Sequence, residues 1–324
     1  MEKLVREILP DGVRESFDAI VEQKILGASR HISMIGEMFE EIARRGAEEK
    51  RQTGQVIGEI KQVADYFIST RGEASQAVAN AIRIMIQGID NYAAMEIDEA
   101  AKEIIHTKDD YRRKAAEDVS QCVKFGVTLA KDMKNIFVYD YSSTVEKFLR
   151  GLSENGHEYN VLVAESRVID GGKPFVKACR EAGHHVKFIP EASMMYYIKE
   201  CDAVFMGAET FYPDGTGFNT TGSDIVGLLC KYFDIPLYFI TPMIKLDVRP
   251  AFGGKKNLVF QNLERKLSEG WTSDEAAEDI DFITPELVGV KPEFIHAFIT
   301  EKGIIPSGQM YEISMDYSRK LRGE

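Results

Sequence analysis

The sequence predicts an α/β protein in which an N-terminal helical domain is followed by a Rossmann-like, doubly wound parallel sheet domain. Two observations lead to this prediction. In the first 130 residues, apolar side chains recur at three- and four-residue spacing with almost no strand signal. After them, short β-branched or aromatic runs alternate with helical stretches. Because 324 residues is long for one domain, we place the helical domain at 1–130 and the sheet domain at 131–324.

The helical domain is predicted from apolar positions that form the faces of amphipathic helices. They are Ile20, Ile25, Ile32, Ile35, Phe39 and Ile42; Val56, Ile60, Val63 and Phe67; and Ala77, Ala81, Ile82, Met85, Ile86 and Ile89. The segment 97–131 continues in a helical pattern. We therefore expect four or five packed helices that end in a long connector.

The sheet domain is predicted from five strand-like runs and the helical stretches between them. The strands are expected at Ile136–Tyr139, Asn160–Ala164, His185–Ile189, Ala203–Met206 and Leu237–Thr241. The helices are expected at Thr144–Leu152, Pro174–Ala182, Ser193–Glu200 and Asp224–Tyr232. Beyond Thr241 the signals weaken, and we expect a mixture of strand, loop and helix between Phe282 and Phe298.

Composition excludes several classes of protein. With 40 Lys and Arg against 52 Asp and Glu, the net charge of -12 argues against generic nucleic-acid binding, although a local basic pocket remains compatible with it. No apolar run approaches the ~20 residues of a membrane span, and the first residues lack a signal-peptide core. The four cysteines are widely separated and show no metal-binding spacing. We expect a cytoplasmic protein with no metal, no organic cofactor and no membrane partner.

Polar residues follow most of the predicted strands. They are Asp140, Ser142 and Ser143 after the first strand, Glu165 and Arg167 after the second, Glu209 and Asn219 after the fourth, and Lys245 after the last. Because the carboxyl ends of parallel strands share one edge of a sheet, these side chains are expected to converge on one crevice. Cations there would pair with phosphate, and carboxylates would bind hydroxyls or move protons. The pattern favours a phosphorylated, polyhydroxylated ligand.

The glycine-rich run 206–223 follows the fourth strand and contains Glu209. Glycines let backbone amides approach an anion closely, and the helix start that follows favours negative charge. Plainer interpretations stay open at this stage. The run is equally compatible with a simple connection, Glu165 and Arg167 with a structural ion pair, and Lys245 with a surface lysine. Asp140 is also placed to be a helix N-cap or the neighbour of one.

An ordered set of short motifs runs through the second half of the chain. They are Glu165-Ser166-Arg167 with Gly171-Gly172, Gly207-Ala208-Glu209, Asn219 with Gly222-Ser223, Pro236-Leu237-Tyr238, Lys245, and the segments 283–287 and 299–306. In these motifs the chain resembles the initiation factor 2B-like family. That family contains the regulatory α, β and δ subunits of the translation factor, methylthioribose-1-phosphate isomerase and archaeal ribose-1,5-bisphosphate isomerase. The helical half matches more loosely, through Gly27-Ala28, Thr70-Arg71 and Asn80-Ala81.

The chain departs from the family's pattern at positions that carry chemistry. Asp140 stands where the isomerases carry a cysteine, and Glu209 stands where they carry an aspartate. Asn219-Thr220 replaces the usual Asn-Lys. Leu26-Gly27-Ala28-Ser29 is similar to the Arg-Gly-Ala-Gly phosphate loop of the ribose-1,5-bisphosphate enzyme, but its arginine is absent. The Arg-Pro-Thr segment of the helical domain has become Arg71-Gly72-Glu73.

The resemblance implies an isomerase that converts an aldose 1-phosphate into a ketose 1-phosphate, with Asp140 and Glu209 as its catalytic pair. Two carboxylates in one site push their pKa values apart, which suits one acid and one base. The substrate-binding residues that it implies are Gly27, Ala28, Ser29, Arg71, Ser142, Ser143, Glu165, Arg167, Asn219, Thr220 and Lys245. Because Leu26 replaces the phosphate arginine, we expect a ligand less charged at that end than a bisphosphate.

The same resemblance supports an alternative. The chain would then be a non-catalytic regulatory protein, like the α subunit of the translation factor, that binds a sugar phosphate or a nucleotide. The regulatory subunits also lack the cysteine, and Tyr141-Ser142 is similar to their Tyr-Ser at this point. By resemblance, either protein would form a homodimer through its sheet domains, and some family members build hexamers. Leu228, Tyr232 and Phe233 fit such a surface, and they fit a helix-on-sheet core equally well.

Overall fold

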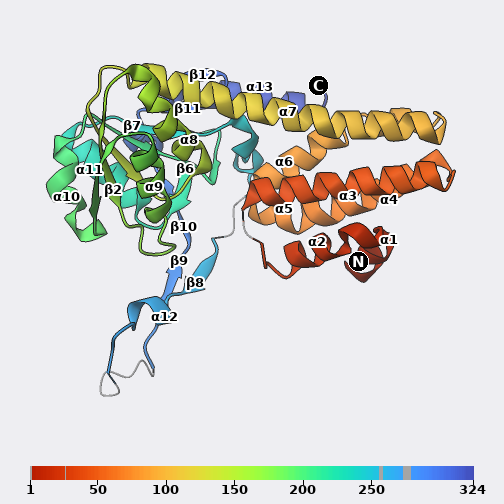
Figure 1. The fold of residues 1–324 in the computed structure, drawn as a ribbon, viewed down its shortest axis with the longest axis horizontal. Helices are drawn as coiled ribbons and strands as arrows, with labels where there is room; N and C mark the ends of the chain where they lie inside the picture. Colours follow the sequence, from red (N-terminus) through yellow and green to blue (C-terminus); the bar gives the residue numbers. More distant parts are fainter. Residues whose placement is uncertain (1, 26, 255–257, 273–278) are drawn as a thin grey trace. The chain divides into compact units, whose positions relative to one another are not determined.

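The computed structural model describes residues 2–25, 27–254, 258–272 and 279–324 as two compact units (Figure 1). The helical unit comprises residues 1–118, 244–246 and 315–324, and the sheet unit comprises 119–243 and 247–314. None of the described helices combines the length and the apolar character needed to cross a membrane.

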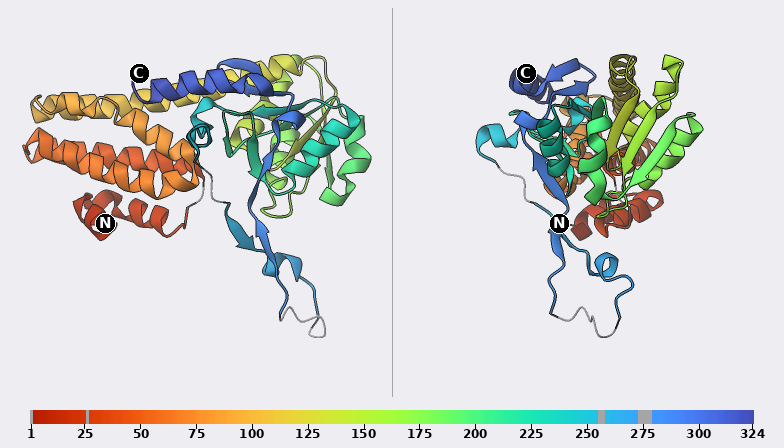
Figure 2. Two further views of the ribbon diagram at one scale, coloured as in Figure 1. Left: turned by 180° about the vertical axis from the view of Figure 1, so that it is seen from behind. Right: turned by 90° about the vertical axis from the view of Figure 1, so that its left-hand side faces the viewer.

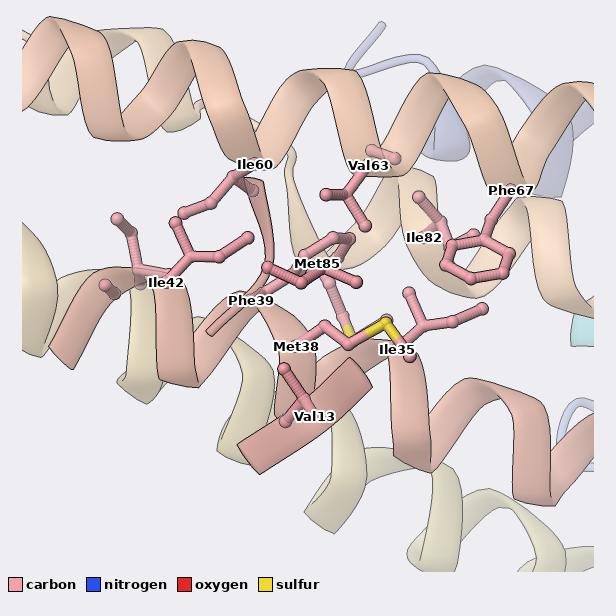
Figure 3. Close-up of a cluster of buried hydrophobic side chains, with 14 of the residues drawn as sticks. Val13, Ile35, Met38, Phe39, Ile42, Ile60, Val63, Phe67, Ile82 and Met85 are labelled. Atoms are coloured by element: carbon pink, nitrogen blue, oxygen red, sulfur yellow. The ribbon is translucent and has the colours of Figure 1, made fainter. Parts of the chain in front are cut away.

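The helical unit is built from amphipathic helices around one apolar core. They are α1 (Glu2–Ile8), α2 (Asp11–Val21), α3 (Ala28–Glu48), α4 (Thr53–Ser69), α5 (Arg71–Ala74), α6 (Gln76–Met85) and the first part of α7 (Ile97–Leu129). Figure 3 shows side chains of α2, α3, α4 and α6 meeting in this core, among them Ile35, Phe39 and Phe67. The apolar faces predicted from the sequence are therefore the packed ones. The first predicted set is divided between two helices, because α2 ends at Val21 and α3 begins at Ala28.

The division between the two units falls inside α7, between Asp118 and Val119. The last turns of this helix carry Cys122 and Val127, which pack in the apolar core of the sheet unit. The C-terminal residues 315–324 belong to the helical unit, where the Gln87 side chain donates a hydrogen bond to the Lys320 carbonyl oxygen at 3.3 Å. The units thus follow packing contacts and depart from the sequence-ordered boundaries at 1–130 and 131–324.

The sheet unit contains a seven-stranded sheet in the order β12-β11-β7-β4-β1-β2-β3. Its strands are β1 (Asn135–Tyr139), β2 (Asn160–Ala164), β3 (His185–Ile189), β4 (Ala203–Met206), β7 (Leu237–Ile240), β11 (Ala297–Thr300) and β12 (Gly303–Pro306). All neighbours pair in parallel except β11 with β12. The five predicted strands are all present to within a residue at either end. The hairpin of β11 and β12 lies beyond the region where the sequence signals were clear.

Helices cover both faces of this sheet (Figure 2). They are α8 (Ser143–Gly151), α9 (Lys173–Glu181), α10 (Met194–Tyr197) and α11 (Ser223–Phe233). The last helix, α13 (Met310–Leu321), begins in the sheet unit and ends in the helical unit. Side chains of α8 and α9 share one core with alternate residues of β1, β2 and β4. The residues between them, such as Phe137 and Val204, are buried outside this core, so both faces are covered and the strands are apolar on successive residues. Short 3-10 turns complete the unit: η2 (Leu152–Asn155), η3 (Glu191–Ser193), η4 (Ile198–Glu200), η6 (Arg249–Phe252), η8 (Pro292–Phe294) and η9 (Ser307–Gln309). The helical unit holds η1 (Ile89–Tyr92), and η5 (Met243–Lys245) runs across its boundary.

Two small antiparallel sheets complete the sheet unit. One has the order β10-β6-β5 and consists of β5 (Thr210–Phe211), β6 (Gly217–Thr220) and β10 (Leu287–Val290). The other pairs β8 (Phe260–Asn262) with β9 (Ile283–Pro285), and α12 (Glu264–Leu267) lies between them in the chain. The glycine-rich run 206–223, expected as a loop, therefore contains two strands. Its glycines at 215 and 222 have φ of 87° and 103°, which suits the turns on either side of β6.

Candidate functional site

The sheet order places a topological switch point between β1 and β4. The chain proceeds from β1 through β2 to β3 on one side and then returns to β4 on the other side of β1. In open α/β sheets, ligands bind in the crevice outside the carboxyl ends of the strands at such a point. Asp140 directly follows β1, and Glu209 is the third residue after β4. Both predicted catalytic carboxylates thus follow the two strands that flank the switch.

Asp140 is a buried carboxylate held by hydroxyl groups from two other loops. Its side chain is 3% exposed; Ser166 Oγ donates to Oδ1 at 2.9 Å and Thr220 Oγ1 donates to Oδ2 at 2.8 Å. Its φ of 56° is left-handed, a conformation that aspartate tolerates better than most residues. The backbone here turns sharply away from the strand, which directs the carboxyl to Ser166 and Thr220.

A glycine makes room for this carboxyl. A Cβ on Gly171 would lie 2.0 Å from Asp140 Oδ1 and 2.8 Å from the Tyr141 amide nitrogen. The helix that follows Asp140 is capped by Ser142, whose Oγ accepts from the Val145 amide at 3.4 Å. Asp140 is therefore not the N-cap of α8, and its carboxyl accepts hydrogen bonds from Ser166 and Thr220 at the sheet edge.

The surroundings of Asp140 raise the pKa of its carboxyl. Burial raises its pKa, and the charge of Glu191 raises it further. Hydrogen bonds from Thr220, Ser166 and the Tyr141 amide stabilise the ionised form and act in the opposite direction. Burial is the largest of these effects, so the pKa of Asp140 lies above its ordinary value. A carboxyl of this kind suits a general acid.

The glycine-rich run is tied to the end of β4 by Asn219. The Asn219 amide nitrogen donates to the Gly207 carbonyl oxygen at 2.8 Å, and its Oδ1 accepts from the Thr220 amide at 2.7 Å. Asn219 is 5% exposed, so its amide shapes the run from within. Gly207 in turn packs on Ser142, because a Cβ there would lie 2.3 Å from the Ser142 Cβ. The ends of β1, β4 and β6 are thereby brought together.

Glu209 has a more open environment than Asp140. It is half-buried, and its backbone amide donates to the Phe218 carbonyl oxygen at 2.8 Å, which extends the β5–β6 hairpin to this residue. The hairpin fixes the Glu209 backbone at the end of β4. The catalytic pairing of Glu209 with Asp140 stays a prediction.

Glu165 and Arg167 form the ion pair that the sequence left open. Arg167 Nη1 lies 3.9 Å from Glu165 Oε2, and the arginine side chain is 45% exposed. A pair this long and this exposed contributes only about 0–1 kcal/mol. Arg167 also donates from Nη2 to the Lys266 carbonyl oxygen at 3.4 Å.

Ser143, another predicted binding residue, is exposed in the first turn of α8.

The remaining predicted residues belong to the helical unit. Gly27, at the N-cap of α3 with φ of 99°, precedes Ala28 and Ser29 in the first turn of that helix. Arg71 Nη2 donates to the Val21 carbonyl oxygen at 2.7 Å. Lys245 is half-buried in a segment whose neighbouring carbonyls, at Ile244 and Leu246, both accept from the Asn80 side chain. Leu26 lies outside the described residues. That these residues share a site with Asp140 stays a prediction.

Two residues at the sheet edge escaped the sequence interpretation as site residues. Ser166 follows the second predicted strand, at the edge where polar side chains are expected to converge, and it holds the Asp140 carboxyl. Glu191 is the second residue after β3. Applying the strand-end rule to β3 as well would have identified it. No group of three or more His, Cys, Asp or Glu side chains in the described part of the chain is arranged to hold a metal ion.

Three of the four cysteines are poor nucleophiles in this fold. Burial raises the pKa of Cys179, Cys201 and Cys230 to about 12 each. Such thiols are not thiolates at neutral pH, and the thiolate is the reactive form.

Comparisons with known proteins agree with this architecture. A family model described as "Initiation factor 2 subunit family" matches residues 27–307. Ribose 1,5-bisphosphate isomerase of Archaeoglobus fulgidus is 24% identical over 299 residues, which cover 92% of this chain and 91% of that protein. Methylthioribose-1-phosphate isomerase of Bacillus anthracis is 27% identical over 213 residues, covering 61% of this chain and 60% of that one.

Solved structures show the same fold at low identity. The 5-methylthioribose 1-phosphate isomerase of Pyrococcus horikoshii matches with a TM-score of 0.73 and 16% identity, covering 97% of this chain and 88% of that chain. The delta subunit of the translation initiation factor from A. fulgidus matches with a TM-score of 0.67 and 20% identity, covering 98% and 96%. The predicted arrangement of a helical region followed by a parallel sheet is confirmed.

Proposed function

Because the chain belongs to the Initiation factor 2 subunit family, we propose that it is a sugar-phosphate isomerase of the aldose 1-phosphate to ketose 1-phosphate type. Relatives named as isomerases of ribose 1,5-bisphosphate and of methylthioribose 1-phosphate support the class of reaction. The observation that carries the proposal is Asp140, a buried carboxyl with a raised pKa at the switch point of the sheet.

The reaction requires one proton donor and one proton acceptor. An anomeric phosphate locks the sugar ring, so an acid must protonate the ring oxygen as its bond to C1 breaks. Hydrogen then moves from C2 to C1, and the 2-hydroxyl loses its proton as the ketone forms. One proton is consumed and one is released, so the reaction is a true isomerisation and needs no external oxidant or reductant.

We assign the acid to Asp140 and the base to Glu209. Asp140 is shielded from water, and burial raises the pKa of its carboxyl, which is the direction that a general acid requires. Glu209 is more exposed and lies at the neighbouring strand end. For binding the sugar phosphate we assign the other predicted residues of the sheet unit, which are Ser142, Ser143, Glu165, Arg167, Asn219 and Thr220.

Asp140 also supplies the observation that favours the alternative. Both of its oxygens already accept hydrogen bonds from Ser166 and Thr220, as those of a purely structural carboxylate would. A regulatory protein that binds a sugar phosphate or a nucleotide without turnover would have this arrangement as well. The two functions differ in whether hydrogen moves between C2 and C1.

A screen of aldose phosphates by proton NMR in deuterated buffer separates the two functions. We expect the C1 signal of one aldose 1-phosphate to disappear as ketose signals grow. Ribose 1-phosphate and ribose 1,5-bisphosphate form an informative pair, because the loss of arginine at Leu26 favours the less charged ligand. A thermal shift with one of these compounds and turnover with none would refute the isomerase and support the regulatory protein.

We further propose that the protein is a homodimer that pairs through its sheet unit. Ile225, Leu228 and Tyr232 lie at three- and four-residue spacing on α11 and are 51%, 55% and 70% exposed in the single chain. Leu228 and Tyr232 therefore do not belong to the core between helix and sheet. Leu228→Asp combined with Tyr232→Asp should yield a monomer by light scattering, whereas an unchanged mass would reject this surface.

A further inference from the structure

Glu191 is the second residue after β3, at the carboxyl end of the sheet. Its side chain contacts two other loops. Its Oε2 accepts a hydrogen bond from the Arg167 amide at 2.9 Å. Its Oε1 accepts from the Tyr139 hydroxyl, which is also 2.7 Å from the Thr221 carbonyl oxygen. One carboxylate thus joins the β2–α9 loop directly and the β6–α11 turn through a tyrosine.

These are the two segments that hold Asp140. Ser166, which donates to Asp140 Oδ1, is the residue before Arg167. Thr220, which donates to Oδ2, is the residue before Thr221. Tyr139 itself is the residue before Asp140. Each contact of the Glu191 network is therefore made one residue away from a group that fixes the acid.

The network is closely fitted. Tyr139 is fully buried, and burial together with the hydrogen bond to Glu191 raises its pKa, so the hydroxyl stays protonated. A Cβ on Gly222 would lie 2.1 Å from the Tyr139 hydroxyl oxygen and 3.0 Å from Glu191 Oε1. Only a glycine fits at this position, which also has φ of 103°.

We propose that Glu191 is a positioning residue for Asp140 in the proposed isomerase reaction, because it ties together the two segments whose hydroxyls hold the Asp140 carboxyl. It acts through Tyr139 on one side and through the Arg167 amide on the other. The charge of Glu191 also raises the pKa of Asp140. The other groups that act on this carboxyl, Thr220, Ser166 and the Tyr141 amide, lower its pKa through hydrogen bonds.

Hydrogen exchange of the whole protein tests the tie without any substrate. We expect Glu191→Ala to speed amide exchange in both segments, 165–172 and 219–223. Lys266→Met is the matched control. Lys266 holds only the first segment, through the Arg167 carbonyl at 3.0 Å, the Val168 carbonyl at 2.9 Å and Asp170 at 3.1 Å. The Lys266→Met variant should therefore speed amide exchange in 165–172 and leave 219–223 unchanged. Unchanged exchange in 219–223 on Glu191→Ala would overturn the proposal.

Glu191→Gln separates the contacts from the charge. Tyr139 has one proton and two acceptors within reach, so a glutamine nitrogen would donate to the hydroxyl and leave its proton for Thr221. The glutamine oxygen would still accept from the Arg167 amide, so this variant should fold and keep both segments protected. The removal of the negative charge should lower the pH at which Asp140 titrates. Carbon NMR of protein labelled in aspartate carboxyls measures this, with the Asp140 signal identified by its loss in Asp140→Asn.

Kinetics provide the test that rests on the proposed function. We expect Glu191→Ala to lower kcat by about tenfold or more with little change in KM, since a small misplacement of a catalytic group is costly. Glu191→Gln should recover most of this rate, with the pH profile moved to lower pH. An unmoved Asp140 titration in Glu191→Gln would overturn the charge effect. If the wild-type protein turns over no aldose phosphate, the proposed function fails, while exchange and titration still decide the role of Glu191.

Discussion

The strands β1 and β4, which flank the switch point, are each followed by one carboxylate. The two carboxylates differ in burial and in hydrogen bonding. At the end of β1, Asp140 is buried, held by two hydroxyls and packed against a glycine. At the end of β4, Glu209 is half-buried on a hairpin that fixes its backbone. The surroundings of the two carboxylates therefore differ, and the roles proposed for them, acid for Asp140 and base for Glu209, rest on this difference. Burial raises the pKa of the Asp140 carboxyl.

Replacing the buried carboxyl should have the largest effect. Asp140→Asn keeps a group that can bond to Ser166 and Thr220 but cannot donate an acid proton. We expect kcat to fall by about 10³-fold, within the range of general acid catalysis. The C2 to C1 transfer seen by NMR measures this. Retention of more than a tenth of the wild-type rate would mean that the acid lies elsewhere.

Replacing the exposed carboxyl should have a smaller effect. Glu209→Gln should lower kcat by about 10²-fold and leave ligand affinity nearly unchanged, since a base acts only as the reaction proceeds. Glu200→Gln, which removes an exposed carboxylate after α10, is the control and should turn over at the wild-type rate. A loss of ligand binding in Glu209→Gln, measured by calorimetry, would show that Glu209 binds the sugar and does not move its proton.

The close packing at the end of β1 can be tested by stability. Gly171→Ala should destabilise the fold by about 1–3 kcal/mol, because the new methyl group would collide with the Asp140 carboxyl. Gly58→Ala, at an open position inside α4, should instead stabilise by up to about 1 kcal/mol. Urea unfolding measures both. A neutral Gly171→Ala would show that the Asp140 loop moves freely, in contradiction to the contrast with Glu209.

The smallest expected effect is a pH dependence of stability. The pKa of Asp140 is higher in the folded than in the unfolded protein, so the folded state binds more protons above the unfolded value of about 3.9. The contribution of this carboxyl is complete below that pH and is lost as pH rises through its folded pKa. The free energy of unfolding of Asp140→Asn should therefore rise relative to wild type from about pH 4 upward. A difference that stays constant with pH would argue that Asp140 ionises normally.

Much of the sheet edge was predictable because strands and their ends have local signatures. Successive apolar residues, as in Val161–Ala164, predict a buried strand. A polar residue at the end of a parallel strand is then assigned to the ligand-binding edge by topology alone. Asp140 and Glu209 were found in this way. The same rule assigns Ser166 to this edge, but its contact with Asp140 is not predictable, because the sequence beside a serine does not show what its hydroxyl contacts.

Other features depend on residues far apart in the chain. The strands β5 and β6 are not evident in the sequence, because the glycines around them have low strand propensity. Their sheet is completed by β10, which pairs with β6 although the paired residues are 67 or more positions apart. The contact of Tyr139 with Glu191 joins residues 52 positions apart. The division of α7 between two cores follows packing that a continuous helical pattern does not reveal.

The sequence by itself predicted the alternation of helices and strands along the chain and the two carboxylates that follow the first and fourth strands. These follow from local periodicity and from the shared edge of parallel strands. The order of the strands in the sheet, and with it the switch point, came from the structure. Only the tertiary structure decided that Asp140 is buried between two hydroxyls, that Glu209 is more exposed, and that Glu191 joins the segments around the acid. Burial and hydrogen bonding between loops depend on which segments meet in space, and desolvation, the largest effect on the pKa of Asp140, exists only once they have met.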